Sequence, residues 1–182
     1  MECAHHEYNQ ESQQNSGFLR RNLWFCNEEV KTCTYNMLVR PILEYAGEVW
    51  DPHSNIQKQR IEMIQRRAAR FCCSDFKRYS SVTTMLARLC WDTLEERRRR
   101  NRLTMLYKIT KGLVGIEGKH YLMPANDTRT RGSNSLKFQR LYTRLDVHKG
   151  SFFVNTVADW NELPDEVVNS PTVEVFKQRL HH

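Results

Sequence analysis

The fold of this chain is decided by two stretches, Gln-Arg-Arg-Ala-Ala-Arg-Phe (residues 65–71) and Leu-Glu-Glu-Arg-Arg-Arg-Arg-Asn-Arg-Leu (residues 94–103). The block 58–111, which contains both, holds 15 Lys and Arg residues against 5 Asp and Glu residues. Residues 1–57 hold 4 against 8 and residues 112–182 hold 9 against 8, so the formal net charge of +7 is concentrated in the middle of the chain. Such local basicity indicates a surface that binds a polyanion.

Helices are expected around both stretches, because apolar residues recur there every three or four positions. The first stretch lies in a helix predicted over residues 55–72. The second lies in a helix predicted to start at Thr93-Leu94-Glu95-Glu96, which fits a capping box. Earlier in the chain, a helix capped by Asn27 is expected to kink or restart at Pro41, and Ser80-Ser81 is expected to cap a short helix. The predicted fold class is therefore mainly α, with a helical bundle.

The two ends of the chain are expected to differ from this bundle. Residues 1–16 are polar and without periodicity, which is typical of disorder. In the tail, Leu136-Lys137-Phe138 alternates and residues 141–147 could supply a partner strand, so a short β-hairpin is predicted. Residues 151–157 are predicted to form either a strand or the entrance to a helix that contains Val157, Trp160 and Leu163. A last helix is predicted from Ser170-Pro171 to Leu180. The predicted organisation is a disordered N-terminus (1–16), a helical region (17–117) and a small α+β tail region (118–182).

The arginines of residues 97–102 are placed unevenly on their predicted helix. At about 100° per residue, Arg98, Arg99 and Arg102 fall on the same side as the apolar residues, whereas Arg97 points away. Their guanidinium groups can line a groove that contacts phosphate, pair with carboxylates elsewhere in the chain, or pack against a missing domain. The candidate nucleic-acid-binding residues are Arg66, Arg67, Arg70, Arg97, Arg98, Arg99, Arg100 and Arg102.

Composition argues against several classes of protein. No apolar run approaches the roughly 20 residues needed to cross a bilayer, and the first residues lack the features of a signal peptide. An intracellular location, in the nucleus or the cytoplasm, is therefore expected, with no membrane partner and with reduced thiols. The six cysteines contain no Cys-x-x-Cys pair. They are interpreted as small buried hydrophobes, with a structural zinc site as the minor alternative.

The sequence lacks the motifs that mark common catalytic sites. It has no Gly-x-x-x-x-Gly-Lys phosphate loop, no Gly-x-Gly-x-x-Gly dinucleotide turn and no His-Glu-x-x-His zinc helix. Two-metal phosphoryl transfer requires clustered carboxylates, whereas the aspartates here are scattered at 51, 75, 92, 127, 146, 159 and 165. We therefore expect no catalytic residue, no metal site, no cofactor and no small-molecule substrate.

Several stretches of the chain stand together in an order that resembles a known family. They are Val-Arg-Pro-Ile-Leu-Glu-Tyr-Ala-Gly-Glu-Val-Trp-Asp-Pro (39–52), Gln-Arg-Arg-Ala-Ala-Arg-Phe (65–71), Leu-Glu-Glu-Arg-Arg (94–98), Ser-Phe-Phe (151–153) and Trp-Asn-Glu-Leu-Pro (160–164). This pattern resembles the segment that follows the polymerase core in reverse transcriptases of non-LTR retrotransposons, the jockey-like and CR1-like group. The resemblance covers about residues 17–180.

The resemblance implies a carboxy-terminal fragment of an RNA-directed DNA polymerase, with thumb-like helices and a small tail domain but without the catalytic palm. In that family the aromatic-x-Asp-Asp motif lies upstream of this region, and no two aspartates are adjacent here. The chain departs from the family at Val154-Asn155, where a proline and a basic residue are common, which weakens the case for nucleic-acid contacts from that loop. Trp160 matches the family and is interpreted as a core anchor, because its neighbours recur helically.

The basic block leaves three functional hypotheses. The first is a non-catalytic module that binds the backbone of RNA, of an RNA–DNA hybrid or of DNA duplex through the candidate arginines. The second is a protein-interaction remnant whose basic face docks an acidic partner or the missing polymerase core. The third is a decayed open reading frame without a selected role. Salt-sensitive binding distinguishes the first, because each phosphate contact adds about 0.9 to the slope of log affinity against log salt.

Overall fold

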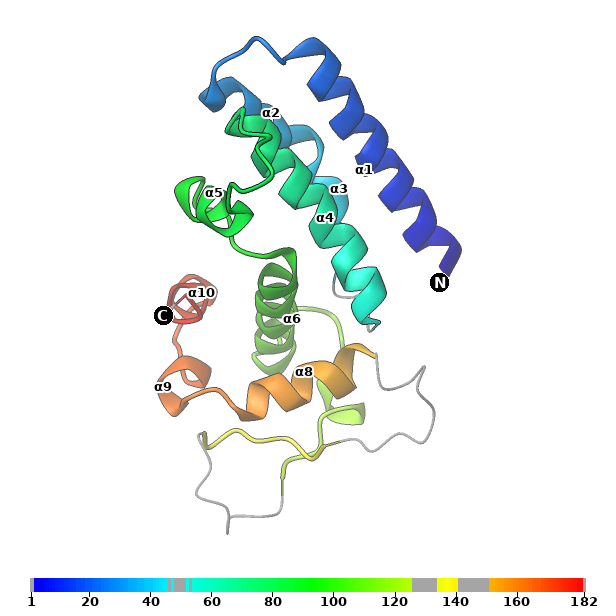
Figure 1. The fold of residues 1–182 in the computed structure, drawn as a ribbon. Coiled ribbons are helices and arrows are strands. Elements are labelled where there is room, and N and C mark those ends of the chain that lie inside the picture. Colours follow the sequence, from blue (N-terminus) through cyan, green and yellow to red (C-terminus); the bar gives the residue numbers. More distant parts are fainter. Residues whose placement is uncertain are drawn as a thin grey trace. The chain divides into compact units, whose positions relative to one another are not determined.

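The structure is a computed structural model that describes residues 2–45, 47, 52, 54–125, 134–140 and 151–181. Within these residues the chain is mainly α-helical, with nine α-helices and a single isolated β-bridge in place of strands (Figure 1). Contacts divide the chain into two compact units, Met1–Arg97 (unit 1) and Arg98–His182 (unit 2). The division falls inside a helix, whereas the sequence suggested a boundary near residue 117. No helix among the described residues is long and apolar enough to span a membrane.

Unit 1 contains five complete helices, and their starts follow the expected capping chemistry. Asn27 Oδ1 accepts a hydrogen bond of 3.0 Å from the Val30 amide, and Ser81 Oγ accepts one of 3.4 Å from the Thr84 amide. Pro41 lies in the first turn of a new helix, so of the two predicted alternatives, a kink or a restart, the structure shows the restart. The helices are α1 (Glu2–Asn22), α2 (Glu28–Leu38), α3 (Arg40–Glu44), α4 (Asn55–Cys72) and α5 (Val82–Arg88).

Helix α1 occupies the stretch for which the sequence predicted disorder. It packs against α2, α3 and α4, and it buries Leu19 at 3% exposure and Ser12 completely (Figure 1). Ser12 is buried, but because it is small and polar it adds nothing to an apolar pattern in residues 1–16 that could have predicted a helix. Tertiary packing therefore orders a segment whose own pattern is uninformative.

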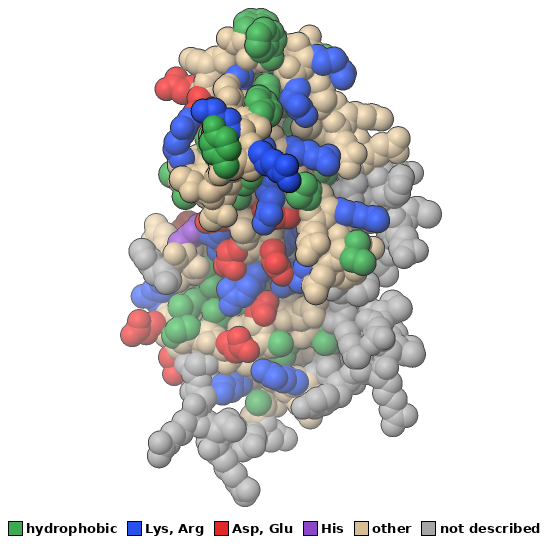
Figure 2. Space-filling model, in the orientation of Figure 1, with side chains coloured by type: hydrophobic (Ala, Val, Ile, Leu, Met, Phe, Trp, Pro, Cys, Tyr) green, Lys and Arg blue, Asp and Glu red, His purple; other side chains and the backbone are tan. Residues whose placement is uncertain are grey.

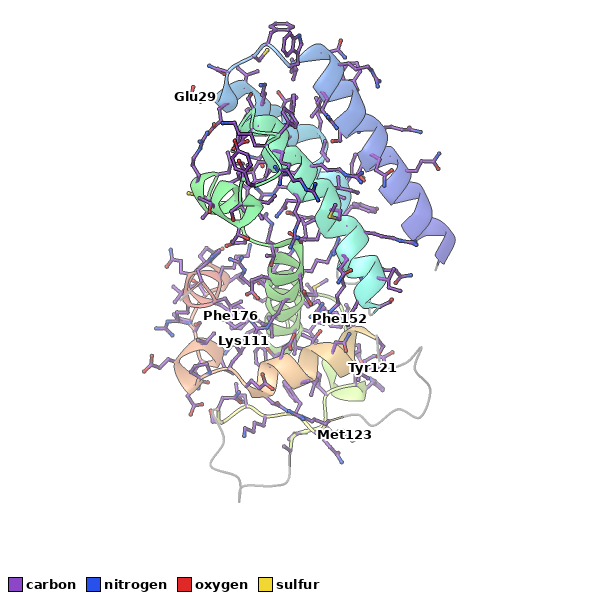
Figure 3. All side chains as sticks on the ribbon, viewed as in Figure 1. Glu29, Lys111, Tyr121, Met123, Phe152 and Phe176 are labelled. Carbon is purple, nitrogen blue, oxygen red and sulfur yellow. The ribbon has the colours of Figure 1, made fainter. Side chains whose placement is uncertain are left out.

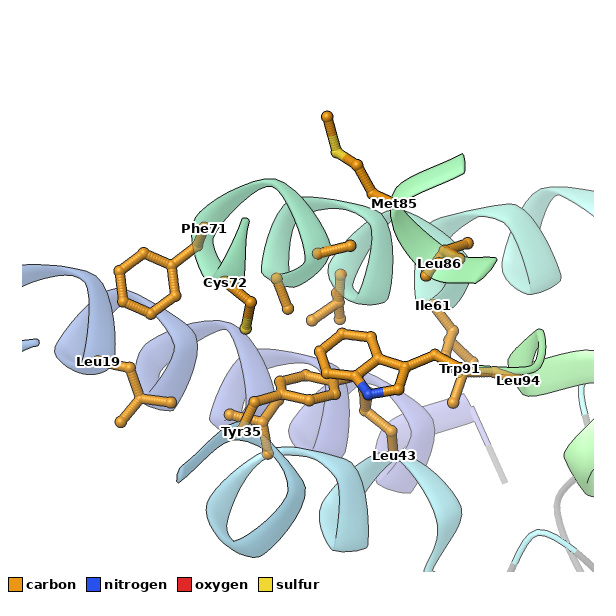
Figure 4. Packing of buried hydrophobic residues seen from close by; sticks show 14 residues of the cluster. Leu19, Tyr35, Leu43, Ile61, Phe71, Cys72, Met85, Leu86, Trp91 and Leu94 are labelled. Carbon is orange, nitrogen blue, oxygen red and sulfur yellow. The ribbon is translucent and has the colours of Figure 1, made fainter. Parts of the chain in front are cut away.

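The core of unit 1 is built around α4. The residues predicted to face inward on this helix, Ile61, Ile64, Ala68, Phe71 and Cys72, are all buried. Figure 4 shows how the neighbouring helices, together with Trp91 and Leu94 further along the chain, complete this core. There the Tyr35 and Trp91 rings stack with their centroids 4.4 Å apart.

Unit 2 begins inside α6 (Leu94–Thr110), whose first turn belongs to unit 1. One of the two hydrogen bonds of the predicted capping box is present, because Thr93 Oγ1 accepts a hydrogen bond of 3.2 Å from the Glu96 amide. Glu62 Oε2 also accepts a 3.0 Å hydrogen bond from the Leu94 amide. Gly112 follows the end of the helix with φ +67°, a conformation that glycine adopts without strain. The other helices are η1 (Gly118–His120), α8 (Phe152–Asn161), α9 (Asp165–Val168) and α10 (Val173–Arg179).

Aromatic side chains of α6, α8 and α10 form the core of unit 2. Trp160 and Phe176 are fully buried, which confirms the interpretation of Trp160 as a core anchor. The Tyr107 ring stacks on Phe176 with centroids 4.4 Å apart, and its hydroxyl donates a 2.6 Å hydrogen bond to the Ser170 carbonyl. Figure 3 shows these side chains on the ribbon, with Phe176 labelled on α10 and Phe152 on α8.

No β-hairpin is present in the described part of the tail. Phe138 forms an isolated antiparallel bridge with Pro124, and residues 141–147, the predicted partner strand, lie outside the described residues. The Asn161 side chain accepts a 3.0 Å hydrogen bond from the Phe138 amide and donates one of 2.8 Å to its carbonyl. A side chain of α8 therefore satisfies the backbone groups that a second strand would have paired.

Candidate nucleic-acid interface

The eight candidate arginines are divided between the two units. Arg66, Arg67 and Arg70 lie on α4 and Arg97 on the first turn of α6, all in unit 1. The remaining four belong to unit 2, and they are Arg98, Arg99, Arg100 and Arg102. The environment of each side chain decides which of them can meet a ligand.

The two arginines of α6 that are best buried do not form an open groove. Arg98 is 2% exposed and Arg102 is 8% exposed. Arg102 Nη2 donates a 3.1 Å hydrogen bond to Asp159 Oδ2 on α8, and Arg99 Nε lies 3.8 Å from the same oxygen. These guanidinium groups therefore take part in the packing and charge balance of unit 2.

Two further arginines of α6 contact other side chains of their own unit. Arg97 Nε lies 2.5 Å from Glu44 Oε1, and its Nη2 donates a 3.2 Å hydrogen bond to Oε2 of the same carboxylate. Arg97 is therefore held by one hydrogen bond and one close charge contact to the same carboxylate. Arg100 contacts the ring of His181 at the end of the chain.

Arg70 shapes a loop of unit 1. Its Nη1 donates a 3.0 Å hydrogen bond to the Lys77 carbonyl, and its Nη2 donates one of 3.2 Å to the Ser80 carbonyl. Both acceptors belong to residues 73–81, the connection between α4 and α5. Arg70 is thereby engaged with the backbone of this connection.

Arg66 and Arg67 differ from the other six candidates. Both are exposed, and neither forms an ion pair with any residue that the structure describes. At about 100° per residue they share an arc of about 120° on α4 with Arg60, Met63 and Arg70. The only acidic residue of α4 is Glu62, whose side chain accepts a hydrogen bond from the Leu94 amide. The exposed side of α4 is therefore basic.

The sequence pattern missed three exposed arginines that extend this basic side. Arg60 lies on the same side of α4, and Arg20 and Arg21 lie in the last turn of α1. Arg20 and Arg67 both line a shallow groove between α1 and α4. We call Arg20, Arg21, Arg60, Arg66 and Arg67 the arginine face. Figure 2 shows Lys and Arg side chains intermixed with hydrophobic ones over the drawn face of unit 1.

The cysteines and acidic residues form no catalytic or metal site among the described residues. No group of three or more His, Cys, Asp and Glu side chains there is placed to hold a metal ion. The expected burial of the cysteines is correct for Cys72 and wrong for Cys33 and Cys90, which are exposed. Cys90 lies between α5 and the buried Trp91, with φ +54°.

The Cys72 thiol is expected to be inert at neutral pH. Burial raises its pKa to about 11. At pH 8 only about 0.1% would be the reactive thiolate, so a thiol reagent should modify Cys33 and Cys90 long before Cys72. Because the folded pKa is raised, the protonated thiol stabilises the fold at low pH. This contribution should decline as the pH rises from about 8.5, the pKa of an unfolded thiol, toward 11.

Mass spectrometry after pulsed alkylation measures the order of modification. The control is the chain unfolded in guanidinium chloride, in which all six cysteines should react. Rapid labelling of Cys72 in the folded protein at pH 8 would contradict the burial of the Cys72 side chain in the core of unit 1.

Comparison with known proteins adds no relative to this picture: no family model, no curated protein and no solved structure matches the chain.

Proposed function

We propose that this protein is a non-catalytic nucleic-acid-binding module that holds the sugar–phosphate backbone on the arginine face. The observation that carries the proposal is the exposed side of α4, whose Arg66 and Arg67 lack ion-pair partners among the described residues. Guanidinium groups bind phosphate oxygens through two parallel N–H donors and remain charged at any physiological pH. An exposed set of them attracts a polyanion without first breaking an internal ion pair.

The arginines of α6 have a different part in this proposal. Arg97 and Arg102 are already engaged with Glu44 and Asp159, so binding phosphate with them would require breaking these contacts. We therefore assign backbone binding to unit 1 and give the α6 arginines a structural role. The ligand is still the polyanion that the sequence indicates, but its binding site is on unit 1 and no longer includes the arginines of α6.

Replacing Arg60, Arg66 and Arg67 together with glutamine is expected to weaken binding to RNA and DNA and to lower its salt dependence. Each lost phosphate contact removes about 0.9 from the slope of log affinity against log salt for duplex and about 0.7 for a single strand. The triple variant should therefore lose about 2 to 3 from this slope. Fluorescence anisotropy of a labelled oligonucleotide over a series of salt concentrations measures both quantities.

The matched control removes three exposed positive charges from unit 2. Lys111, Arg140 and Lys177 are exposed there, and their replacement with glutamine changes the net charge by the same amount. The control variant should keep most of the affinity and the slope. Equal losses in both variants would mean that binding follows net charge alone, and the arginine face would then be no site.

The resemblance to non-LTR retrotransposon reverse transcriptases supports a wider proposal, in which the chain is the post-palm part of such a polymerase and works inside the cell. Sequencing the transcript upstream of Met1 tests it, because an in-frame polymerase palm is expected there. The rival is an acidic protein partner on the same arginines. Binding of such a partner with no measurable affinity for nucleic acid at low salt would replace our proposal with the rival.

A further inference from the structure

One end of unit 1 exposes four large aromatic side chains. Trp24 is 73% exposed, Phe25 75%, Phe76 60% and Tyr79 84%. They come from two connections, residues 23–27 between α1 and α2 and residues 73–81 between α4 and α5. Large aromatic side chains exposed together at one end are uncommon on a protein that works alone, and they mark a place where a partner binds.

The two connections lie at the same end of the unit, as Figure 1 shows for the ribbon. The guanidinium carbon of Arg20, in the last turn of α1, lies 5.8 Å from the centroid of the Phe76 ring. Lys31 Nζ, on α2, donates a 2.7 Å hydrogen bond to Ser74 Oγ. Both helices that flank the first connection are thereby joined to the second.

The second connection is held in shape by its own hydrogen bonds. In addition to the two carbonyls bound by Arg70, Asp75 Oδ1 accepts a 3.0 Å hydrogen bond from the Lys77 amide. A hydrogen bond with the Ser80 side chain, followed by that from the Lys77 amide, keeps the pKa of Asp75 below its usual range. A loop that is ordered in advance presents Phe76 and Tyr79 with little entropy left to lose when a ligand binds.

Cations are interleaved with the rings at this end. Lys77 Nζ lies 6.0 Å from the Tyr79 ring centroid, and Arg78 beside it is exposed. Arg20 and Arg21 add two positive charges from α1. Of the nearby carboxylates, Glu28 pairs with Arg88 and Asp75 is engaged within the loop, whereas Glu29 in the first turn of α2 is exposed. Among the described residues, four cations thus lie near a single exposed carboxylate. The rings therefore lie in a basic setting.

We propose that this aromatic–basic end, formed by Trp24, Phe25, Phe76 and Tyr79 with Arg20, Arg21, Lys77 and Arg78, binds single-stranded nucleic acid. Unpaired bases stack on the exposed rings and the phosphates contact the cations. The inference rests on the proposed function, because it names the class of nucleic acid that the module would take.

The chemistry favours a single strand over the other polyanions. In a duplex the base faces are stacked on one another, so exposed rings contribute nothing to binding it. An acidic protein would use the cations but would leave four rings in contact with water. A single strand uses both, since every base has a face that stacks on an aromatic ring and every nucleotide carries a phosphate.

The test compares a labelled oligouridine of about 15 nucleotides, the length of one typical binding site, with a hairpin duplex of similar length. The F76A/Y79A double variant removes two stacking rings and should bind the single strand at least about thirtyfold more weakly. Its affinity for the duplex and its salt slope should be unchanged, because all cations remain. The conservative F76Y/Y79F variant retains both rings and should bind the single strand almost as well as the wild type.

The matched control removes exposed apolar side chains elsewhere. Met37 is 70% exposed on α2 and Leu113 is 59% exposed, and M37A/L113A should leave both affinities unchanged. Trp24 gives a second readout, because stacking quenches its fluorescence. The wild type should lose emission when oligouridine is added, and the W24F variant should not.

The outcomes separate this inference from the proposed function. If F76A/Y79A binds the single strand as the wild type does, while the triple arginine variant still loses affinity, the stacking site is wrong and backbone binding stands. If the wild type binds no nucleic acid at low salt, both proposals fail. If the rings prove necessary only for binding an acidic protein, this end is a protein-docking surface and the inference is overturned.

Discussion

Replacing Trp160 with alanine is expected to unfold unit 2 or to leave it only marginally stable. The indole ring is fully buried, packs within 6.1 Å of Phe138 and 5.9 Å of Phe176 between ring centroids, and donates a 2.8 Å hydrogen bond from Nε1 to the Leu136 carbonyl. Truncating a buried tryptophan typically costs about 3–5 kcal/mol. A domain has only about 5–15 kcal/mol of stability in total, so this single change removes a large share of it.

Trp24 provides a matched control for this prediction, since it is 73% exposed. The W24A variant should unfold at the same denaturant concentration as the wild type. Guanidinium chloride titration followed by far-UV circular dichroism measures the free energy of unfolding. Hydrogen exchange on α8 and α10 shows whether the loss is confined to unit 2. Wild-type stability in the W160A variant would contradict the core described for unit 2.

Two double variants that remove the same number of charges are expected to affect different properties: one should lower the stability of the fold and the other should weaken nucleic-acid binding. R98Q/R102Q should destabilise the protein by about 3 kcal/mol, because it removes two buried guanidinium groups and leaves the Asp159 carboxylate without its closest partner. We place the value at the lower end of the usual range because the Asp159 side chain is 28% exposed. R66Q/R67Q should leave the stability unchanged within about 0.5 kcal/mol, since both side chains are exposed and lack ion-pair partners among the described residues.

Binding should follow the reverse order. R66Q/R67Q should reduce the affinity for nucleic acid, and R98Q/R102Q should preserve it under conditions in which unit 2 remains folded. Melting curves and anisotropy titrations on the same two preparations measure both properties. A stable R98Q/R102Q protein that no longer binds nucleic acid would show that the binding site includes α6. It would also contradict the structural role that we assign to the α6 arginines.

Local sequence signals predicted the helices well, because their causes lie close together in the chain. Asn27, Pro41 and Ser81 each mark a helix start through groups within three residues of themselves. The inward face of α4 was also visible, since a period of 3.6 residues shows directly which side chains are apolar. The same periodicity placed Arg98 and Arg102 on the apolar side of α6, and both are buried.

The candidate site was predicted less well, because charge density in a sequence does not show where each charge is neutralised. The run of four arginines in residues 97–100 is the strongest basic signal, yet Arg97 pairs with Glu44, 53 positions away. Asp159, the partner of Arg102, is 57 positions away. The arginines that remain exposed come from less conspicuous places, among them Arg20, which follows a stretch that looked disordered.

By itself, the sequence determined that this protein is helical, where most of its helices begin and which of their faces turn inward, because capping and periodicity act over a few residues. Only the tertiary structure decided that α1 is ordered, that Phe138 forms an isolated bridge with Pro124, and which arginines face solvent. Those outcomes depend on burial and on ion pairs between segments far apart in the chain. Folding brings these charges and side chains together, and no local pattern records which partners meet.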